Sequence, residues 1–206
     1  MKLYGHPLSS CTRKALLVAA EKQTTLDFAL VDLFVGAHHA PEYLARHPFG
    51  VIPMLEDGDF TLYESRAIAK YLDAVLPGPS LIPTAPRARA RMEQWLSCDA
   101  SYVAPHTRAL AHQLIVRPHM GQSSDAAAIH AGQEAVARAF GVFDKHLASS
   151  TYLVDDALSL ADVSLAPYVA SLAMLNATHL LETTPHLRRW WQTVSARAGW
   201  ELLTAR

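Results

Sequence analysis

The sequence of 206 residues has little cysteine, almost no net charge and no long apolar run. Cys11 and Cys98 are its only cysteines and lie far apart, so we expect no disulfide framework. With 18 basic and 19 acidic residues the net charge is −1, which offers no attraction for nucleic acid or an anionic membrane surface. No apolar run approaches the roughly 18 residues of a membrane-spanning helix, and no signal-peptide core follows Met1. We therefore expect no nucleic-acid partner, no membrane partner and a cytoplasmic location.

The sequence also lacks the patterns of a metal site, although it contains eleven histidines. None of them falls in a His-Glu-x-x-His pattern or in paired Cys/His spacing. We therefore expect no metal.

A proline-rich stretch divides the chain. Between Leu76 and Pro86 four prolines and a glycine separate two helix-like stretches, which indicates a linker. We expect a first domain over residues 1–76, a linker over 77–86 and a second domain over 87–206.

The two halves differ in their apolar periodicity. The first alternates strand-like and helix-like runs and predicts a small α/β domain, whereas the second has apolar residues at helical spacing and predicts an all-α bundle. The expected strands are Lys2–Tyr4, Leu26–Val31, Ile52–Glu56 and Thr61–Leu62, and the first helices are Thr12–Glu21 and Ala67–Leu76. The expected helices of the second half are Ala88–Ile115, Ala126–Leu147, Ala161–Asn176 and Leu187–Ala196.

A turn with three nucleophile-capable side chains, "GHPLSSCTR", follows the first strand. Pro7 ends the strand, and Ser9 or Ser10 falls where a helix N-cap is expected. Cys11 comes next and is a candidate thiol. From the residues alone the stretch can be a serine cap, a thiol redox site or a place where the thiol of another molecule is activated.

Several motifs spread over nearly the whole chain resemble those of the glutathione transferases, in particular a phi-like class with a catalytic serine. "KLYGHPLSSCTR" resembles the first strand and catalytic turn of that class, and "HHAPEYL", "HPFGVIPMLEDGD" and "LYESRAI" resemble its next segments. In the second half "YLVDDALSLADVSLAP" and the pair Trp190-Trp191 are similar to family segments.

The resemblance implies a thioredoxin-like α/β domain of order βαβαββα, followed by an all-α helical bundle. It implies an enzyme of detoxification that conjugates the thiolate of reduced glutathione to small hydrophobic electrophiles. Glutathione is then a co-substrate and no other cofactor is expected. Ser9 aligns with the catalytic serine of the family, whose hydroxyl donates a hydrogen bond to the thiolate and lowers its pKa.

The glutathione site is implied by the same alignment. A cis bond before Pro53 would expose the backbone of Ile52 to the cysteinyl part of glutathione, with Val51 beside it. Ser65, at a helix N-terminus, would bind the γ-glutamyl carboxylate. Glu64 would bind the ammonium group.

His38 and His39 lie where the family contacts the glycyl carboxylate. Each of these site residues also has a plainer interpretation: Ser65 as a helix cap, Glu64 as a solvated acid and the two histidines as polar surface. Their joint spacing favours the functional interpretation. Ser159 and Asp162, in contrast, form a Ser-x-x-Asp pattern typical of an N-capping box, so Asp162 is assigned to structure.

Two neighbours compete with Ser9 for the catalytic role. Ser10 would donate the hydrogen bond if the turn were shifted by one residue. Cys11 could itself form a mixed disulfide with glutathione, which would make the protein a thiol transferase or peroxidase. Tyr4 is expected to be a core residue.

Three positions depart from the family pattern, which has glutamine at Val51, lysine at His39 and asparagine at His47. Losing one amide hydrogen bond costs about 0.5–1.5 kcal/mol of glutathione affinity. A non-catalytic protein that binds glutathione and hydrophobic ligands is therefore an alternative.

The electrophile pocket is assigned to apolar side chains around the turn and on the first helix of the second half. The candidates are Leu8, Leu33, Tyr102 and Leu110, each of which could equally be a core residue. For assembly we expect a homodimer in which Phe49 packs on the helical half of the partner; the alternative is that Phe49 lies under its own loop.

Overall fold

Four short strands form one mixed sheet in the order β2-β1-β3-β4. A computed structural model describes residues 1–203 of the chain. Strand β1 (Lys2–Gly5) pairs in parallel with β2 (Asp27–Leu30) and antiparallel with β3 (Met54–Asp57). Strand β3 pairs antiparallel with β4 (Phe60–Tyr63), as the two-residue connection between them requires.

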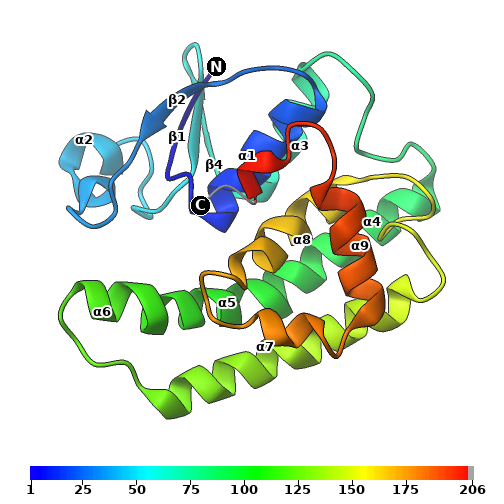
Figure 1. The fold of residues 1–206 in the computed structure, drawn as a ribbon. Coiled ribbons are helices and arrows are strands. Elements are labelled where there is room, and N and C mark those ends of the chain that lie inside the picture. Colours follow the sequence, from blue (N-terminus) through cyan, green and yellow to red (C-terminus); the bar gives the residue numbers. More distant parts are fainter. Residues whose placement is uncertain (204–206) are drawn as a thin grey trace. The chain divides into compact units, whose positions relative to one another are not determined.

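Helices cover both faces of this sheet. Helices α1 (Ser10–Glu21) and α3 (Ser65–Val75) pack together on one face, and α2 (Pro41–Leu44) lies on the other (Figure 1). The buried residues of this layer come from both helices and from β1 and β3: Leu3, Leu17, Val18, Leu55, Ile68 and Leu72. The core on the α2 face is built on Val31, Tyr43 and Met54. The order βαβαββα confirms the predicted thioredoxin-like domain.

The register of the sheet brings four chain segments to one edge. Gly5 at the end of β1 lies opposite Leu30 at the end of β2, and Tyr4 lies opposite Met54 at the start of β3. Met54 in turn pairs with Tyr63 at the end of β4. The turn after β1, the loop after β2, the entry to β3 and the exit from β4 therefore meet at the same edge.

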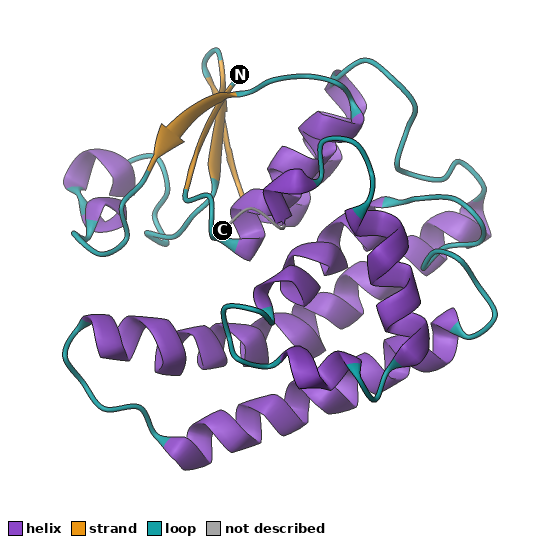
Figure 2. Cartoon of the chain, in the orientation of Figure 1, coloured by secondary structure: helices purple, strands orange, loops and turns teal. Residues whose placement is uncertain are grey.

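The second unit, Pro83–Ala196, contains helices and a single isolated β-bridge (Figure 2). Helix α8 (Leu160–Ser171) is buried along its whole length, with α4 (Pro86–Cys98) and α9 (Pro185–Ser195) packed against it. Helix α7 (Ala126–Leu147) packs on α9 and on α5 (Ala104–Ala111), and the short α6 (Arg117–His119) follows the helical run that contains α5. The predicted all-α bundle is confirmed.

The buried carboxylate of Asp162 organises the start of α8. It accepts hydrogen bonds from the backbone N–H of Ser159 at 3.0 Å and of Leu153 at 2.9 Å, and from the indole of Trp190 at 2.8 Å. The Ser159 side chain completes a capping box, which confirms the structural role predicted for this pair. Burial raises the pKa of Asp162, and these hydrogen bonds oppose the rise.

The expected continuous helix Ala88–Ile115 is instead a longer helical run with two π-helical turns, Asp99–Val103 and His112–Val116. Each turn ends two residues before a proline, Pro105 or Pro118. A proline inside a helix has no N–H to donate and its ring collides with the carbonyl four residues earlier. The wider π turn moves that carbonyl away, so the helix continues through both prolines.

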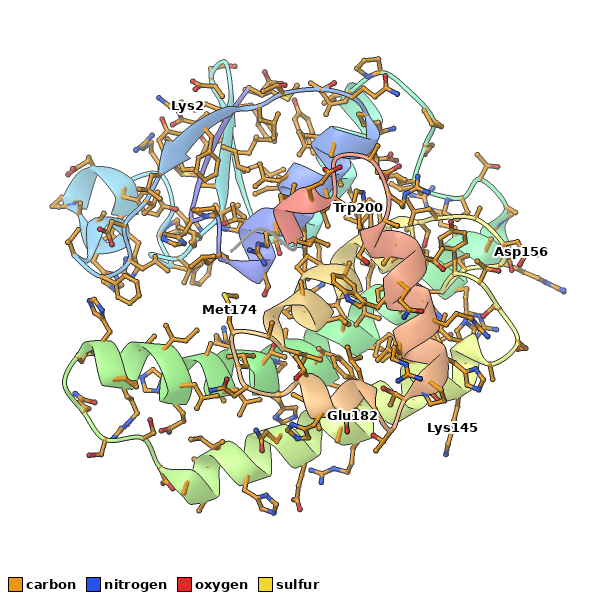
Figure 3. The ribbon with its side chains drawn as sticks, in the orientation of Figure 1. Lys2, Lys145, Asp156, Met174, Glu182 and Trp200 are labelled. Carbon is orange, nitrogen blue, oxygen red and sulfur yellow. The ribbon has the colours of Figure 1, made fainter. Side chains whose placement is uncertain are left out.

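The described residues after Ala196 cluster with the α/β unit, whereas the expected second domain runs over residues 87–206. The segment that starts at Arg197 clusters with residues 1–82. Arg197 forms two hydrogen bonds of 2.7 Å to the carboxylate of Glu21, and Trp200 is fully buried in the segment beside α1 (Figure 3). Positions 204–206 of the expected range lie outside the described residues.

Over residues 1–203, no helix combines the length and the apolar character needed to cross a membrane.

A buried ion pair holds the start of the linker to the α/β unit. The ammonium of Lys22 lies 2.8 Å from Asp73, and the two side chains are 1% and 2% exposed. Lys22 also donates to the carbonyl of Pro79, while Asp73 accepts from the N–H of Leu81 and the hydroxyl of Ser80. One carboxylate and one ammonium therefore fix residues 79–81.

We predict that Asp73→Ala lowers the free energy of unfolding by about 3–5 kcal/mol, because it leaves the Lys22 ammonium buried without a counter-charge. The double variant Lys22→Met/Asp73→Leu should lose clearly less, since it leaves no isolated charge. Urea unfolding of both variants measures the difference. A single variant as stable as the double variant would contradict this prediction.

Candidate active site

Two hydrogen bonds of His6 close the turn between β1 and α1. The N–H of Ser9 donates to the carbonyl of His6 at 2.9 Å, which makes His6–Ser9 a β-turn. The N–H of His6 donates to Oγ1 of Thr12 at 3.3 Å. Thr12 is fully buried against Gly5, where a Cβ would lie 2.5 Å from Thr12 Oγ1. Only glycine lets the helix approach the strand this closely.

Ser9 is the N-cap of α1. Its Oγ accepts a hydrogen bond of 3.3 Å from the N–H of Thr12, and its backbone is extended, as a cap requires. A serine hydroxyl that accepts through a lone pair still has its hydrogen to donate. The plainer interpretation as a cap and the functional one are therefore compatible.

Ser10 and Cys11 lie inside the helix that Ser9 caps. Ser10 is its first residue, and Cys11 is a half-buried free thiol in the first turn. The nearby Lys14 side chain is fully buried, and burial holds the pKa of its ammonium well below its usual value. The charge of Cys11 acts in the opposite direction on the pKa of Lys14.

The entry to β3 carries the expected cis bond, between Ile52 and Pro53. Val51 before it is exposed, and its carbonyl accepts a hydrogen bond of 2.7 Å from the hydroxyl of Tyr43. Tyr43 is buried, and burial raises the pKa of its phenol to about 12, so the phenol keeps its proton. The hydroxyl of Tyr43, a residue of α2, thus holds the backbone just before the cis bond.

Glu64 and Ser65 lie where β4 passes into α3. Glu64 has a φ of 72°, which is uncommon for a residue with a side chain. Its carboxylate makes no capping hydrogen bond to α3, and the side chain is exposed. Ser65 is buried as the first helical residue, so its hydroxyl lies among the leading N–H groups of α3.

His38 and His39 are neighbours in a short 3-10 helix, Ala37–His39, with ring centroids 3.8 Å apart and ring planes tilted by 41°. Gly50 lies against them, since a Cβ there would be 3.0 Å from Nδ1 of His39. Nδ1 of His38 is buried without a hydrogen-bond partner among residues 1–203. Burial, and next the charge of His39, lower the pKa of His38.

The sheet register thus gathers the expected glutathione residues of the α/β unit at one edge: Ser9, His38, His39, Val51, Ile52, Pro53, Glu64 and Ser65.

Sequence reasoning did not foresee the environment of His47. Its imidazole is fully buried and stacked between Tyr43 and Tyr63, at centroid distances of 5.9 and 4.5 Å. Neither ring nitrogen has a hydrogen-bond partner in the described part of the chain. Burial lowers the pKa of His47, and the charge of Glu64 partly opposes this. The fold therefore holds this ring neutral.

Phe49 follows His47 and is 70% exposed. Its ring contacts the edges of His47 and Tyr63, at centroid distances of 6.4 and 5.9 Å. One side of the Phe49 ring therefore packs on these two residues and the rest is exposed to solvent. This disfavours the alternative that Phe49 lies buried under its own loop.

The four residues expected in the electrophile pocket differ in burial. Leu8 and Leu33 are exposed in the α/β unit, and Tyr102 is exposed in the helical unit. Leu110 is fully buried and packs against Gly132 of α7, where a Cβ would lie 2.9 Å from it. Leu110 therefore packs in the core of the helical unit, which favours the alternative of a core residue that the sequence left open.

Among residues 1–203 no group of three or more His, Cys, Asp or Glu side chains is placed to hold a metal ion.

Comparison with known proteins decides the family. Residues 1–74 match the model of the glutathione S-transferase N-terminal domain, and residues 107–198 match that of the C-terminal domain. The chain belongs to the glutathione S-transferase family.

Similar family members come from plants. Glutathione S-transferase 3 of Zea mays is 37% identical over 100% of this chain and 93% of its own length. The crystal structure of glutathione transferase F7 from Populus trichocarpa has a TM-score of 0.90 at 32% identity, covering 98% of this chain and 97% of that one. Maize glutathione S-transferase I, solved with an atrazine glutathione conjugate, has a TM-score of 0.88 at 26% identity, covering 98% and 96%.

These relatives confirm the predicted family, its phi-like class and the predicted enzyme class, a glutathione transferase. The roles given to single residues of this family member stay predictions.

We predict that the neutral His47 ring makes the stability of this transferase fall with acidification. The pKa of His47 is lowered in the folded state, so the unfolded chain takes up the proton first as the pH falls below about 6.5. Stability contributed by the neutral ring is then complete above about pH 6.5 and lost below it. Urea unfolding at several values between about pH 7.5 and 5.5 measures the slope.

His47→Asn is the matched control, because it removes the titrating ring and leaves His38 in place. We expect the wild type to lose more stability over this range than the variant. Parallel pH dependences of the two proteins would exclude His47 as the source.

Proposed function

We propose that this chain conjugates the thiolate of glutathione to small hydrophobic electrophiles, with Ser9 as the hydrogen-bond donor to that thiolate. The observation that carries the proposal is the geometry of Ser9. Its Oγ accepts a hydrogen bond from the N–H of Thr12, so the hydroxyl hydrogen can still be donated to a second partner at the N-terminus of α1. Maize glutathione S-transferase I, a relative of the same fold, is solved with a glutathione conjugate.

The energies suffice for this chemistry. Lowering a thiol pKa from about 8.5 by two units requires roughly 2.7 kcal/mol. One hydrogen bond to a charged group contributes about 1.5–3 kcal/mol. The positive end of the α1 dipole adds about 0.3–1 kcal/mol. A serine that never loses its own proton can therefore keep the thiol ionised near neutral pH.

The remaining groups fit the parts of the tripeptide. The leading N–H groups of α3 and the Ser65 hydroxyl would bind the γ-glutamyl carboxylate, and the exposed carboxylate of Glu64 would bind the ammonium. The backbone of Ile52, before the cis Pro53, would pair with the cysteinyl part, with Val51 beside it.

His38 and His39 would donate ring N–H groups to the glycyl carboxylate. The lowered pKa of His38 does not prevent this, because a neutral imidazole still has one N–H to donate. For the electrophile we propose contacts with the exposed side chains of Leu8 and Leu33 in the α/β unit.

We predict that Ser9→Ala lowers kcat/KM with a chlorodinitrobenzene-type electrophile by about 10- to 100-fold, as the thiolate loses its hydrogen bond. The pKa of the bound thiol should rise with it. Because Ser9 also caps α1, the variant should lose about 1 kcal/mol of stability, so the kinetics are measured well below its thermal transition.

Ser10→Ala and Cys11→Ala are the matched controls in the same turn. An unchanged pH–rate profile in Ser9→Ala would reject its role. A loss in Cys11→Ala, together with thiol-transfer activity in the wild type, would favour mixed-disulfide chemistry at Cys11. Retention on glutathione resin without any turnover would favour the non-catalytic alternative.

The exposed Phe49 supports a second part of the proposal, a homodimer with Phe49 in the interface. A large aromatic ring that is open to water on one side is a typical anchor for a partner pocket. Two-fold symmetry would bury it twice.

We predict that Phe49→Ser shifts the protein towards the monomer in analytical ultracentrifugation. Turnover should fall as well, because the same loop leads directly to Val51. Phe60→Ser is the control, since Phe60 is also exposed but lies on β4 against Tyr71. A dimeric, fully active Phe49→Ser protein would place the interface elsewhere.

A further inference from the structure

The imidazole of His6 makes a hydrogen bond inside the turn that carries Ser9. The backbone N–H of Leu8 donates to Nδ1 of His6 at 3.2 Å. A backbone N–H can only donate, so Nδ1 must hold a lone pair and the ring proton must lie on Nε2. The bond therefore requires a neutral ring in one tautomer.

The other contacts of this turn do not involve Leu8. The carbonyl of His6 accepts from Ser9, and the carbonyl of Pro7 accepts a hydrogen bond of 2.7 Å from Nε of Arg13. The N–H of His6 is bonded to Thr12. Leu8 occupies the third position of the β-turn, directly before Ser9, and its side chain is exposed.

We infer that His6 is a positioning residue, whose imidazole holds the peptide between Pro7 and Leu8 and thereby aims the Ser9 hydroxyl. The inference rests on the proposed role of Ser9. His6 need not touch glutathione for this.

A short turn with several hydrogen bonds leaves its backbone little freedom. Thr12 fixes both Ser9 and His6, and the Pro7–Leu8 peptide between them is held at two atoms: its carbonyl by Nε of Arg13 and its N–H by the imidazole of His6. Pro7 has a restricted φ at the second position of the turn, and the imidazole restrains the N–H of the peptide that follows it. Without the acceptor, the Leu8 N–H turns to water and the Ser9 backbone samples a wider range.

Three substitutions separate this role from a merely structural one. His6→Asn places an amide oxygen near the position of Nδ1 and keeps the acceptor. His6→Gln has the same functional group one methylene further out, near the position of Nε2, and His6→Leu has no acceptor. Each variant is made alone and in the Ser9→Ala background, and thermal unfolding verifies that all are folded.

The readouts are the kinetics of conjugation and the thiolate absorbance of bound glutathione as a function of pH. We expect His6→Leu and His6→Gln to lower kcat/KM by about 3- to 10-fold, the size of one neutral hydrogen bond, and to raise the pKa of the bound thiol. His6→Asn should be close to the wild type. In the Ser9→Ala background the three variants should be equal, because no hydroxyl remains to be aimed.

Hydrogen exchange of the Leu8 amide supplies a measurement that needs no turnover. We expect exchange to accelerate in His6→Leu and His6→Gln but not in His6→Asn. An amide that exchanges equally fast in all of them would overturn the inference.

The failure of the inference is distinguishable from the failure of the proposed function. If Ser9→Ala slows conjugation while His6→Leu matches the wild type, or if the His6→Leu loss persists in Ser9→Ala, the positioning role is rejected and Ser9 keeps its role. If Ser9→Ala itself is as active as the wild type, the proposed role of Ser9 is rejected and the inference falls with it.

Discussion

The α/β unit depends on the close contact between Gly5 and Thr12. A strand followed by a helix normally needs room for the side chains at the junction, but here any Cβ at Gly5 would overlap the threonine hydroxyl. Because glycine removes that obstacle, only four residues separate the end of β1 from the start of α1. The same contact lets Oγ1 of Thr12 accept a hydrogen bond from the N–H of His6, while the N–H of Thr12 donates to Oγ of Ser9. The N-terminus of α1 is thereby held at the edge of the sheet where the other loops meet.

Some residues at this edge stabilise the fold and also carry the proposed chemistry. Ser9 caps a helix through a lone pair of its hydroxyl, and in the proposed function the same hydroxyl donates its hydrogen to a thiolate. Ser65 and the first N–H groups of α3 likewise belong to the fold, and they form the proposed site for the γ-glutamyl carboxylate. His47 contributes differently: a neutral ring among tyrosines supports the loop that carries Phe49 and Val51.

What the sequence predicts well is what local pattern and turn chemistry determine. The alternation of strands and helices before the linker, the capping box of Ser159 and Asp162 and the length of α7 depend on residues near in sequence. The residues expected to bind glutathione come from motifs that resemble the family, since neither Val51 nor His38 has a pattern of its own. The resemblance supplied what periodicity could not.

Expectation and structure differ where residues far apart in the sequence determine the local conformation or burial. A helical apolar period runs through Pro105 without a break, so the π turn before it follows only from the steric demand of the ring. Leu110 has the spacing of a pocket residue and a core residue alike, and the nearby Gly132 makes it core. The aromatic stack around His47 joins α2, a loop and β4, which no single window of sequence contains.

The return of the segment after Arg197 to α1 has a consequence for how the protein matures during synthesis. The ribosome releases residues 1–82 long before it makes the residues that pack against Ala20 and Glu21. The α/β unit therefore emerges first but cannot complete its packing until the helical unit between its two pieces has been translated. The turn after β1 and residues 197–203 are parts of one folding unit, so neither is fully packed before the other has been made.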